Sequence, residues 1–115
     1  MPSLFVLDDD NGLLQVLQIL LSKHRFSVQG FTKSDALIQA LQLQTPDIIL
    51  LDVVLAEEIS GNSLCSKLRQ GYHYQNKIYL FSATHLKNDD LLQCGANGFI
   101  DKPFDISVLI ATLKQ

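Results

Sequence analysis

The segment PDIILLDVVL, residues 46–55, decides the fold of this chain. It contains four consecutive large apolar residues, 48–51, between Pro46-Asp47 and the carboxylate of Asp52. A short, uninterrupted apolar run of this kind is typical of a strand buried on both faces of a parallel sheet. We therefore expect a central strand whose carboxyl end presents Asp52. Ligands bind at that end of open parallel sheets, although an isolated aspartate after a strand more often only caps a turn.

Strands and helices alternate along the rest of the chain. Besides the central strand, short apolar segments predict strands at 4–7, 27–31, 77–81 and 97–100. Apolar residues at helical spacing predict helices over 13–25, 34–41, 62–70, 85–94 and 105–113, with Ser34 and Asp105 as amino-terminal caps. The inward-facing residues expected of the second helix are Ala36, Leu37, Ala40 and Leu41. This alternation predicts an α/β fold, a doubly wound five-stranded parallel sheet with helices on both faces.

The composition restricts the classes of partner and the location. The net charge is −3 and the nine Lys and Arg residues are scattered, which argues against a nucleic-acid surface in this segment. No apolar run approaches the roughly 20 residues of a membrane helix, and no basic region precedes the first apolar residues, as it would in a secretory signal. The length of 115 residues suits a single domain, 1–115, and we expect a cytoplasmic protein.

The cysteines and histidines do not form a recognisable site of their own. Cys65 and Cys94 form no C-x-x-C motif, so they are expected to be reduced packing residues. His24, His73 and His85 have no helical i, i+4 pairing, which disfavours a zinc or haem site.

Charged and polar side chains follow the predicted strands at the points where they end. Asp8 and Asp9 follow the first strand, Asp52 ends the central one, and Ser82 and Lys102 follow the last two. Because the carboxyl ends of parallel strands meet at one edge of the sheet, we expect these side chains to lie together. Carboxylates gathered there repel one another, which a divalent cation or a raised pKa relieves. Ligands that are all oxygen favour Mg²⁺ or Mn²⁺ over zinc.

These groups suit phosphoryl transfer to a carboxylate. Asp52 is the predicted nucleophile, because it projects alone from the central strand and can form an acyl phosphate. Asp8 and Asp9 would hold the metal directly or through water, and Lys102 would neutralise charge on the phosphoryl oxygens. Asp10 is expected to cap the following helix instead of binding the metal.

Four motifs of this sequence resemble those of response regulator receiver domains, and the resemblance runs from Leu4 to the last helix. The motifs are VLDDD at 6–10, PDIILLD at 46–52, SA at 82–83 and GANGFIDKPF at 95–104. Each motif alone is weak, whereas their order and spacing together are specific. The resemblance implies a flavodoxin-like (βα)5 fold with the strand order 2-1-3-4-5.

The resemblance also implies roles for individual residues. Asp52 would be the phosphoacceptor, Ser82 the switch hydroxyl and Lys102 the counter-charge of the phosphoryl group. The implied metal ligands are Asp8, Asp9, Asp52 and the backbone carbonyl of Val54. Phe99 matches an aromatic switch position, and the Lys102-Pro103 bond is cis in relatives.

The resemblance implies partners as well. They would be a sensor histidine kinase or histidine phosphotransfer protein, and an output domain or downstream protein. Phosphorylation would change the surface formed by the fourth helix, fifth strand and fifth helix. Such a domain is a switch with weak self-phosphorylation and self-dephosphorylation activity, not a conventional enzyme. We expect a monomer or a phosphorylation-dependent dimer, without direct nucleic-acid or membrane binding by this segment.

The sequence departs from the family pattern at three places. Val54 is apolar where many relatives carry a polar residue, and we hypothesise that it slows hydrolysis of the acyl phosphate. Ala56 replaces the usual proline in a loop that is longer than typical up to Gly61. The segment 82–95 is shorter than typical, which shortens the fourth helix.

Three other interpretations share parts of this pattern. A phosphatase of the haloacid dehalogenase type needs a second acid two residues after the nucleophile, where this chain has Val54. A flavodoxin-like flavin carrier needs a phosphate-binding loop after the first strand, where the acidic residues 8–10 would repel a phosphate. A receiver-like interaction module that is never phosphorylated remains an open alternative.

Overall fold

The computed structural model describes residues 1–55, 60–82 and 93–115. Within them, five parallel strands form one sheet in the order β2-β1-β3-β4-β5, which confirms the predicted α/β fold and strand order. The strands are β1 Ser3–Leu7, β2 Ser27–Phe31, β3 Ile48–Asp52, β4 Lys77–Ser82 and β5 Gly98–Asp101. The described helices are α1 Asn11–Lys23, α2 Ser34–Leu43, α3 Gly61–Gln70 and α5 Ile106–Leu113.

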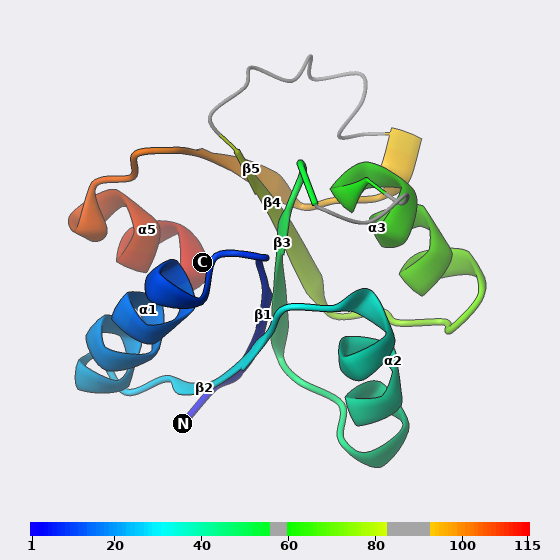
Figure 1. Cartoon of the computed structure of the whole chain (residues 1–115), viewed down its shortest axis with the longest axis horizontal. Coiled ribbons are helices and arrows are strands. Elements are labelled where there is room, and N and C mark those ends of the chain that lie inside the picture. The colour runs from blue at the N-terminus through cyan, green and yellow to red at the C-terminus, as the bar shows by residue number, and fades with distance from the viewer. Residues whose placement is uncertain (56–59, 83–92) are drawn as a thin grey trace.

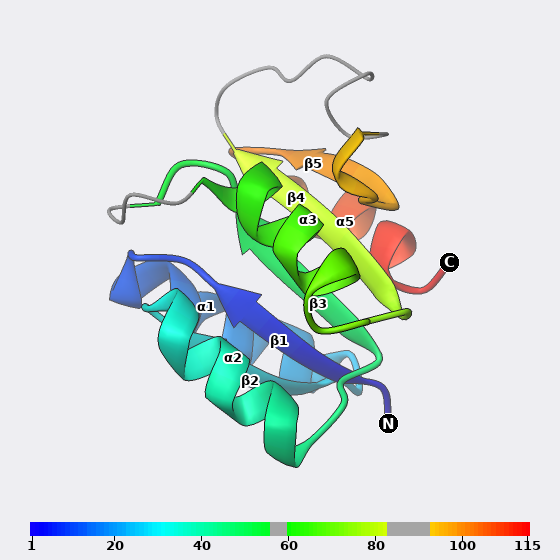
Figure 2. The ribbon, with the colours of Figure 1, turned by 90° about the vertical axis from the view of Figure 1, so that its right-hand side faces the viewer.

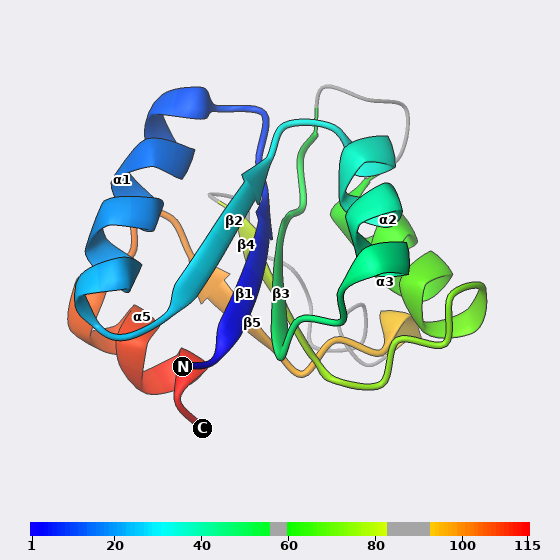
Figure 3. The same ribbon diagram turned by 90° about the horizontal axis from the view of Figure 1, so that it is seen from below.

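The helices cover both faces of the sheet. Figure 1 and Figure 3 show α1 and α5 on one face and α2 and α3 on the other, and Figure 2 looks onto the face that α2 and α3 cover. The loop residues 56–59 and most of the helix predicted over 85–94 lie outside the described residues. In the parts of the chain that are described, no helix has both the length and the apolar character that crossing a membrane requires.

Strand β3 lies at the centre of the sheet, between β1 and β4. All five of its residues are buried. Ile49 and Leu51 join the core under α2 and α3, whereas Ile48 and Leu50 join the core under α1 and α5. Successive side chains of a strand point to opposite faces, so burial on both faces requires the uninterrupted apolar run that the sequence shows.

The helix caps agree with the sequence at two positions and differ at a third. Asp10 caps α1 by accepting a hydrogen bond from a first-turn amide at 3.2 Å, and Asp105 caps α5 in the same way at 2.8 Å. The prediction that Ser34 caps α2 is wrong. Ser34 is the buried first residue of the helix, and Lys33 occupies the cap position without a side-chain hydrogen bond.

The inner face of α2 is rotated from the expected one. Leu37, Ala40 and Leu41 pack on the core as expected, but Ala36 is exposed and Ile38 is buried in its place. This orientation buries more apolar area, because isoleucine carries a larger apolar side chain than alanine.

Both cysteines are buried free thiols. The Cys65 thiol donates a hydrogen bond to the Cys94 carbonyl at 3.2 Å. Burial, with a further contribution from Cys94, raises the pKa of the Cys65 thiol to about 12, so this thiol is protonated at neutral pH. Their surroundings agree with the packing role expected for them.

Backbone hydrogen bonds extend the sheet beyond the carboxyl ends of its strands. The Asp8 amide donates to the last carbonyl of β2 at 3.0 Å, and the Val53 amide donates to the Phe81 carbonyl at 3.1 Å. The Lys102 amide donates to the Ser82 carbonyl at 2.9 Å. The sheet therefore fixes the backbone of the residues that directly follow β1, β3 and β5, at the edge where the polar side chains were expected.

The start of α3 lies directly against the end of β3. The Gly61 amide donates a hydrogen bond to the Val53 carbonyl at 2.9 Å, and Ser60 caps the helix. A Cβ atom at Gly61 would overlap the carbonyl oxygen of Asp52 and would lie 2.8 Å from the Val53 Cα atom. Glycine is needed here because α3 approaches the backbone that carries Asp52 so closely.

We predict that Gly61→Ala lowers the free energy of unfolding by about 2 kcal/mol, because two backbone segments must separate to admit the methyl group. Gly12→Ala is the matched control, since a Cβ in the first turn of α1 meets only the Asp10 side chain. That variant should stay close to the wild type in stability, because the helix preference of alanine offsets its 3.3 Å contact with the side-chain oxygen of Asp10. Urea unfolding followed by circular dichroism measures both. Wild-type stability of Gly61→Ala would contradict the close packing.

Candidate functional site

The carboxyl edge of the sheet gathers three carboxylates. One oxygen atom each of Asp8, Asp9 and Asp52 lies within 4.8 Å of the others. Asp8 directly follows β1 and Asp52 ends β3, and these two strands are paired, so their ends are neighbours. Asp8 is 1% exposed and Asp52 is 5% exposed, whereas Asp9 faces solvent. The structure thus brings together the acidic residues singled out in the sequence.

Lys102 supplies positive charge to this cluster. Its Nζ atom lies 2.8 Å from Asp8 Oδ2 and 3.5 Å from Asp52 Oδ2. The ammonium also lies 4.3 Å from the centre of the Phe81 ring, within the range of a cation–π interaction. The peptide bond between Lys102 and Pro103 is cis, as the resemblance implied. One ammonium does not balance three ionised carboxylates, so the cluster has an excess of negative charge.

The pKa of the Asp52 carboxyl group depends on its burial first and on the surrounding charges second. Burial raises its pKa above the ordinary value, and the charges of Asp8 and Asp9 raise it further. Lys102 and the Val54 amide, which donates to Asp52 Oδ1 at 3.3 Å, act in the opposite direction without cancelling the rise. The ionised carboxylate is therefore costly in the free site, and a cation bound beside it would reduce that cost.

The donor set fits a hard divalent cation. All three acidic residues offer carboxylate oxygens, which Mg²⁺ and Mn²⁺ prefer over nitrogen or sulfur. Both oxygens of Asp8 are engaged, one by Lys102 and the other by a backbone amide at 2.9 Å. Among the described residues, no hydrogen bond or ion pair holds the Asp9 carboxylate. Asp8, Asp9 and Asp52 are the residues that would hold the ion, and participation of the Val54 carbonyl stays a prediction.

The other predicted residues lie around the cluster. Ser82 is buried at the end of β4, and its carbonyl accepts the Lys102 amide. Phe99 lies on the neighbouring strand β5 and packs, half-buried, against the core under α2 and α3. The Val54 side chain is 60% exposed, two residues after Asp52. The structure gives the positions of Ser82, Phe99 and Val54, while the switch roles of Ser82 and Phe99, the ligand role of Val54 and the counter-charge role of Lys102 stay predictions.

The aromatic partner of Lys102 was not found from the sequence. Phe81 pairs with Asp52 between β3 and β4, so its ring can lie beside a cation that contacts the Asp52 carboxylate. An aromatic residue directly before Ser82 was the available signal. It is ambiguous, because the face to which a strand residue points depends on a register that one sequence does not give.

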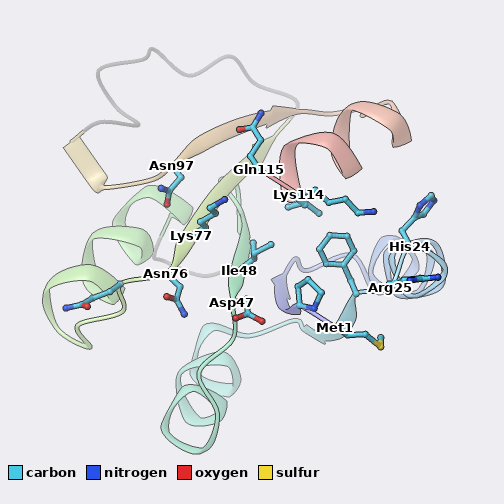
Figure 4. Close-up of a pocket in the computed structure, with 14 residues that line it drawn as sticks. Met1, His24, Arg25, Asp47, Ile48, Asn76, Lys77, Asn97, Lys114 and Gln115 are labelled. Atoms are coloured by element: carbon cyan, nitrogen blue, oxygen red, sulfur yellow. The ribbon is translucent and has the colours of Figure 1, made fainter.

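A cavity of about 890 Å³ lies at the opposite edge of the sheet, where the strands begin (Figure 4). Its lining includes the apolar residues Phe26 and Ile48 and the charged residues Arg25, Lys77 and Lys114. None of the predicted site residues lines it. The chemistry-bearing residues and this cavity are therefore separate features of the molecule.

Comparison with known proteins gives matches along nearly the whole chain. The family model of the response regulator receiver domain matches residues 4–114. The transcriptional regulatory protein AfsQ1 of Streptomyces coelicolor is 31% identical over 119 aligned positions, which cover 99% of this chain and 50% of that protein. This chain therefore spans about half the length of that relative.

Solved structures agree with the family match. The BeF3-activated N-terminal receiver domain of Klebsiella pneumoniae RstA is 26% identical and has a TM-score of 0.86, with 97% of this chain and 95% of that chain covered. The chemotaxis protein CheY4 of Vibrio cholerae has a TM-score of 0.91 over 99% of this chain and 97% of that chain. Its identity of 21% makes it evidence for the fold alone.

We predict that Asp52→Asn stabilises the metal-free protein at neutral pH. Burial raises the pKa of Asp52 in the folded state, so below the unfolded pKa of about 4 both states are protonated and the charge costs nothing. As the pH rises through the folded pKa, the buried anion costs stability. Asparagine avoids that cost, so the gain should be on the order of 1 kcal/mol near pH 7 and should fade toward about pH 4.

Urea unfolding in the presence of EDTA at several pH values measures this difference. Asp101→Asn is the matched control, because Asp101 is an exposed acid at the end of β5. It should change stability little at any pH. A gain for Asp52→Asn that does not vary with pH would show that ionisation of Asp52 is not its cause.

Proposed function

The chain belongs to the family of response regulator receiver domains, and we propose that it is the phosphoacceptor switch of a two-component phosphorelay. The observation that carries the proposal is the shared position of Lys102, whose ammonium contacts two buried carboxylates of a three-carboxylate cluster. Such a cluster can take up a divalent cation and a phosphoryl group together, because the cation and the ammonium compensate the added negative charge.

Asp52 is the carboxylate best suited to accept the phosphoryl group. Asp8 is held by Lys102 at 2.8 Å and by a backbone amide at 2.9 Å, so both of its oxygens are occupied. The contacts of Asp52 are longer, 3.5 Å to Lys102 and 3.3 Å to the Val54 amide. An oxygen of Asp52 can therefore attack with less loss of existing interactions.

The proposed donor is the phosphohistidine of a sensor histidine kinase or a histidine phosphotransfer protein. A carboxylate oxygen of Asp52 attacks the phosphorus atom and forms a P–O bond. The P–N bond breaks, and its electron pair returns to the imidazole of the donor. Lys102 stabilises the charge on the phosphoryl oxygens from the side of Asp8. Asp8, Asp9 and Asp52 would hold a Mg²⁺ ion, which would supply further charge compensation.

The signal would leave the site through β4 and β5. Ser82 lies at the end of β4, where its hydroxyl can turn toward a phosphoryl group on Asp52, and Phe99 lies on the adjacent strand. We propose that phosphorylation favours one of two states of the surface formed by the helix predicted over 85–94, β5 and α5, and that an output domain or partner binds this state. Small phosphodonors would phosphorylate the domain weakly, and hydrolysis of the acyl phosphate would return it to the starting state.

We predict one Mg²⁺-dependent phosphoryl adduct after incubation with acetyl phosphate, seen by intact-mass spectrometry and removed by hydroxylamine. Asp52→Ala should carry no adduct, because the attacking carboxylate is gone. Asp101→Ala, which removes an exposed carboxylate near the same edge, should be labelled like the wild type. No adduct on a wild-type protein that binds Mg²⁺ would instead support a phosphorylation-independent interaction module, the alternative function.

We predict that Val54→Asn shortens the lifetime of the acyl phosphate. Val54 offers an exposed apolar side chain close to Asp52, whereas an amide could hydrogen-bond the attacking water. One added hydrogen bond of about 1 kcal/mol in the transition state corresponds to a roughly fivefold faster loss. Decay of the mass adduct after removal of the donor gives the rate. Val108→Asn, a similarly exposed valine on α5, is the control, and equal lifetimes in all three proteins would contradict the hypothesis.

A further inference from the structure

The guanidinium of Arg69, in the last turn of α3, joins three separate parts of the chain. Its Nη1 atom donates to the carbonyls of Tyr74, at 2.8 Å, and Asn76, at 2.5 Å, in the segment before β4. Its Nε atom donates to the Gly95 carbonyl at 3.0 Å, and its Nη2 atom donates to Asn97 Oδ1 at 2.8 Å. Gly95 and Asn97 belong to the segment 95–97, which leads into β5 and is called here the β5 entry.

The side chain of Asn97 continues the β4–β5 pairing beyond the strand. The Asn97 amide donates to the Ile78 carbonyl at 2.7 Å. In return, the Ile78 amide donates to the side-chain oxygen Oδ1 of Asn97 at 2.9 Å, which takes the place of a backbone acceptor. Arg69 donates to that same oxygen, so the guanidinium fixes the atom that holds the β5 entry to β4.

The backbone conformation of Gly95 permits its contact with Arg69. Its φ angle of +85° lies in the left-handed region that favours glycine. A Cβ atom would lie 3.1 Å from the Cγ atom of Arg69, because the arginine side chain crosses directly over this residue. All four acceptors of Arg69 are neutral oxygens, and no carboxylate among the described residues forms an ion pair with it. The guanidinium can donate to all four oxygens because its donors are spread over three nitrogen atoms in one plane, whereas the three donors of a lysine ammonium share a single nitrogen.

Strand β5 is therefore held at both ends. At its exit, the Lys102 amide bonds the Ser82 carbonyl and the Lys102 ammonium contacts the acidic cluster. At its entry, Arg69 and Asn97 fix the chain to α3 and β4. Phe99 lies between the two anchors. Because the entry is fixed, β5 cannot slip as a whole. A displacement that begins at the exit is therefore taken up by the residues between the two anchors.

We propose that Arg69 is a positioning residue of the switch, which fixes the β5 entry so that a change at the Asp52 site is transmitted to Phe99 and α5. The proposal rests on the phosphoacceptor function proposed above. It assigns Arg69 no contact with the phosphoryl group, since its four acceptors lie in the segments before β4 and β5, at the opposite ends of those strands from Ser82 and Lys102. Loss of Arg69 should therefore separate phosphorylation from the surface response.

The test compares Arg69→Gln with Lys67→Gln, which removes an exposed positive charge from the same helix. Backbone amide spectra are recorded with Mg²⁺, before and after adding acetyl phosphate or beryllofluoride. In Arg69→Gln, the amides of Asn97 and Ile78 should exchange with solvent about tenfold faster, because the entry opens more often. Phosphoryl uptake at Asp52 should stay within about twofold of wild type. The chemical-shift changes that phosphorylation causes in the amides of β5 and α5 should be smaller than in the wild type by about half or more.

Two further variants distinguish positioning from a general loss of stability. Asn97→Asp keeps an oxygen acceptor for both Arg69 and Ile78, so it should respond like the wild type. Asn97→Ala removes that acceptor and should behave like Arg69→Gln, and it replaces that variant if Arg69→Gln does not fold. All spectra are compared at a temperature where each variant is folded.

A full response of β5 and α5 in phosphorylated Arg69→Gln, despite faster exchange at Asn97, would overturn the proposal. A reduced response in Lys67→Gln of the same size would overturn it as well, because charge and not the specific contacts would then be responsible. Absence of a phosphoryl adduct on the wild-type protein is a different result, since it contradicts the proposed function itself.

Discussion

Two buried carboxylates, Asp8 and Asp52, share one ammonium group, and the rest of the structure maintains this unequal arrangement. Buried anions are tolerated only when hydrogen bonds or opposite charges compensate them. Asp8 obtains that compensation from Lys102 at 2.8 Å and from a backbone amide. Asp52 obtains less, because its contact with Lys102 is longer, and burial raises the pKa of its carboxyl group above the ordinary value. The strands and the close approach of Gly61 hold these groups in place, because a flexible edge would let the carboxylates move apart into water.

Under the proposed function, the uneven sharing of Lys102 gives Asp8 a structural role and leaves Asp52 as the reacting carboxylate. Asp8, which has the shorter contact, is a structural partner of the ammonium. Asp52 has the longer contact, so its oxygen is held less tightly. In the proposed function, a cation and a phosphoryl group bind at Asp52. Lys102 need not leave Asp8 entirely to reach the phosphoryl oxygens. The Phe81 ring also contacts the ammonium, at 4.3 Å from the ring centre, which limits the number of positions that the ammonium can adopt.

The sequence predicts those features that depend on local pattern. The apolar run 48–51 predicted the buried central strand, and the position of the acids after β1 and β3 predicted their meeting at one edge. Features that depend on strand register or on side-chain direction could not be predicted from the sequence. The face of Phe81 depends on the pairing of β3 with β4, and the contacts of Arg69 depend on how α3 lies over the start of β4. Ser34 was misplaced for a related reason, since a serine near a helix start can be either the cap or the first buried residue.

Arg69 and Lys102 hold β5 at its opposite ends, which distinguishes this edge strand from the central strands. A central strand is held along its whole length by neighbours on both sides, whereas β5 pairs only with β4. Its position therefore depends more on what holds its ends, which are Arg69 with Asn97 at the entry and Lys102 at the exit. The entry contacts are to neutral oxygens that no phosphorylation changes, while the exit contacts are to the acidic cluster itself. In the proposed switch, a change in the charge of the site would act on the exit of β5 and not on its entry, and Phe99 lies between these two ends.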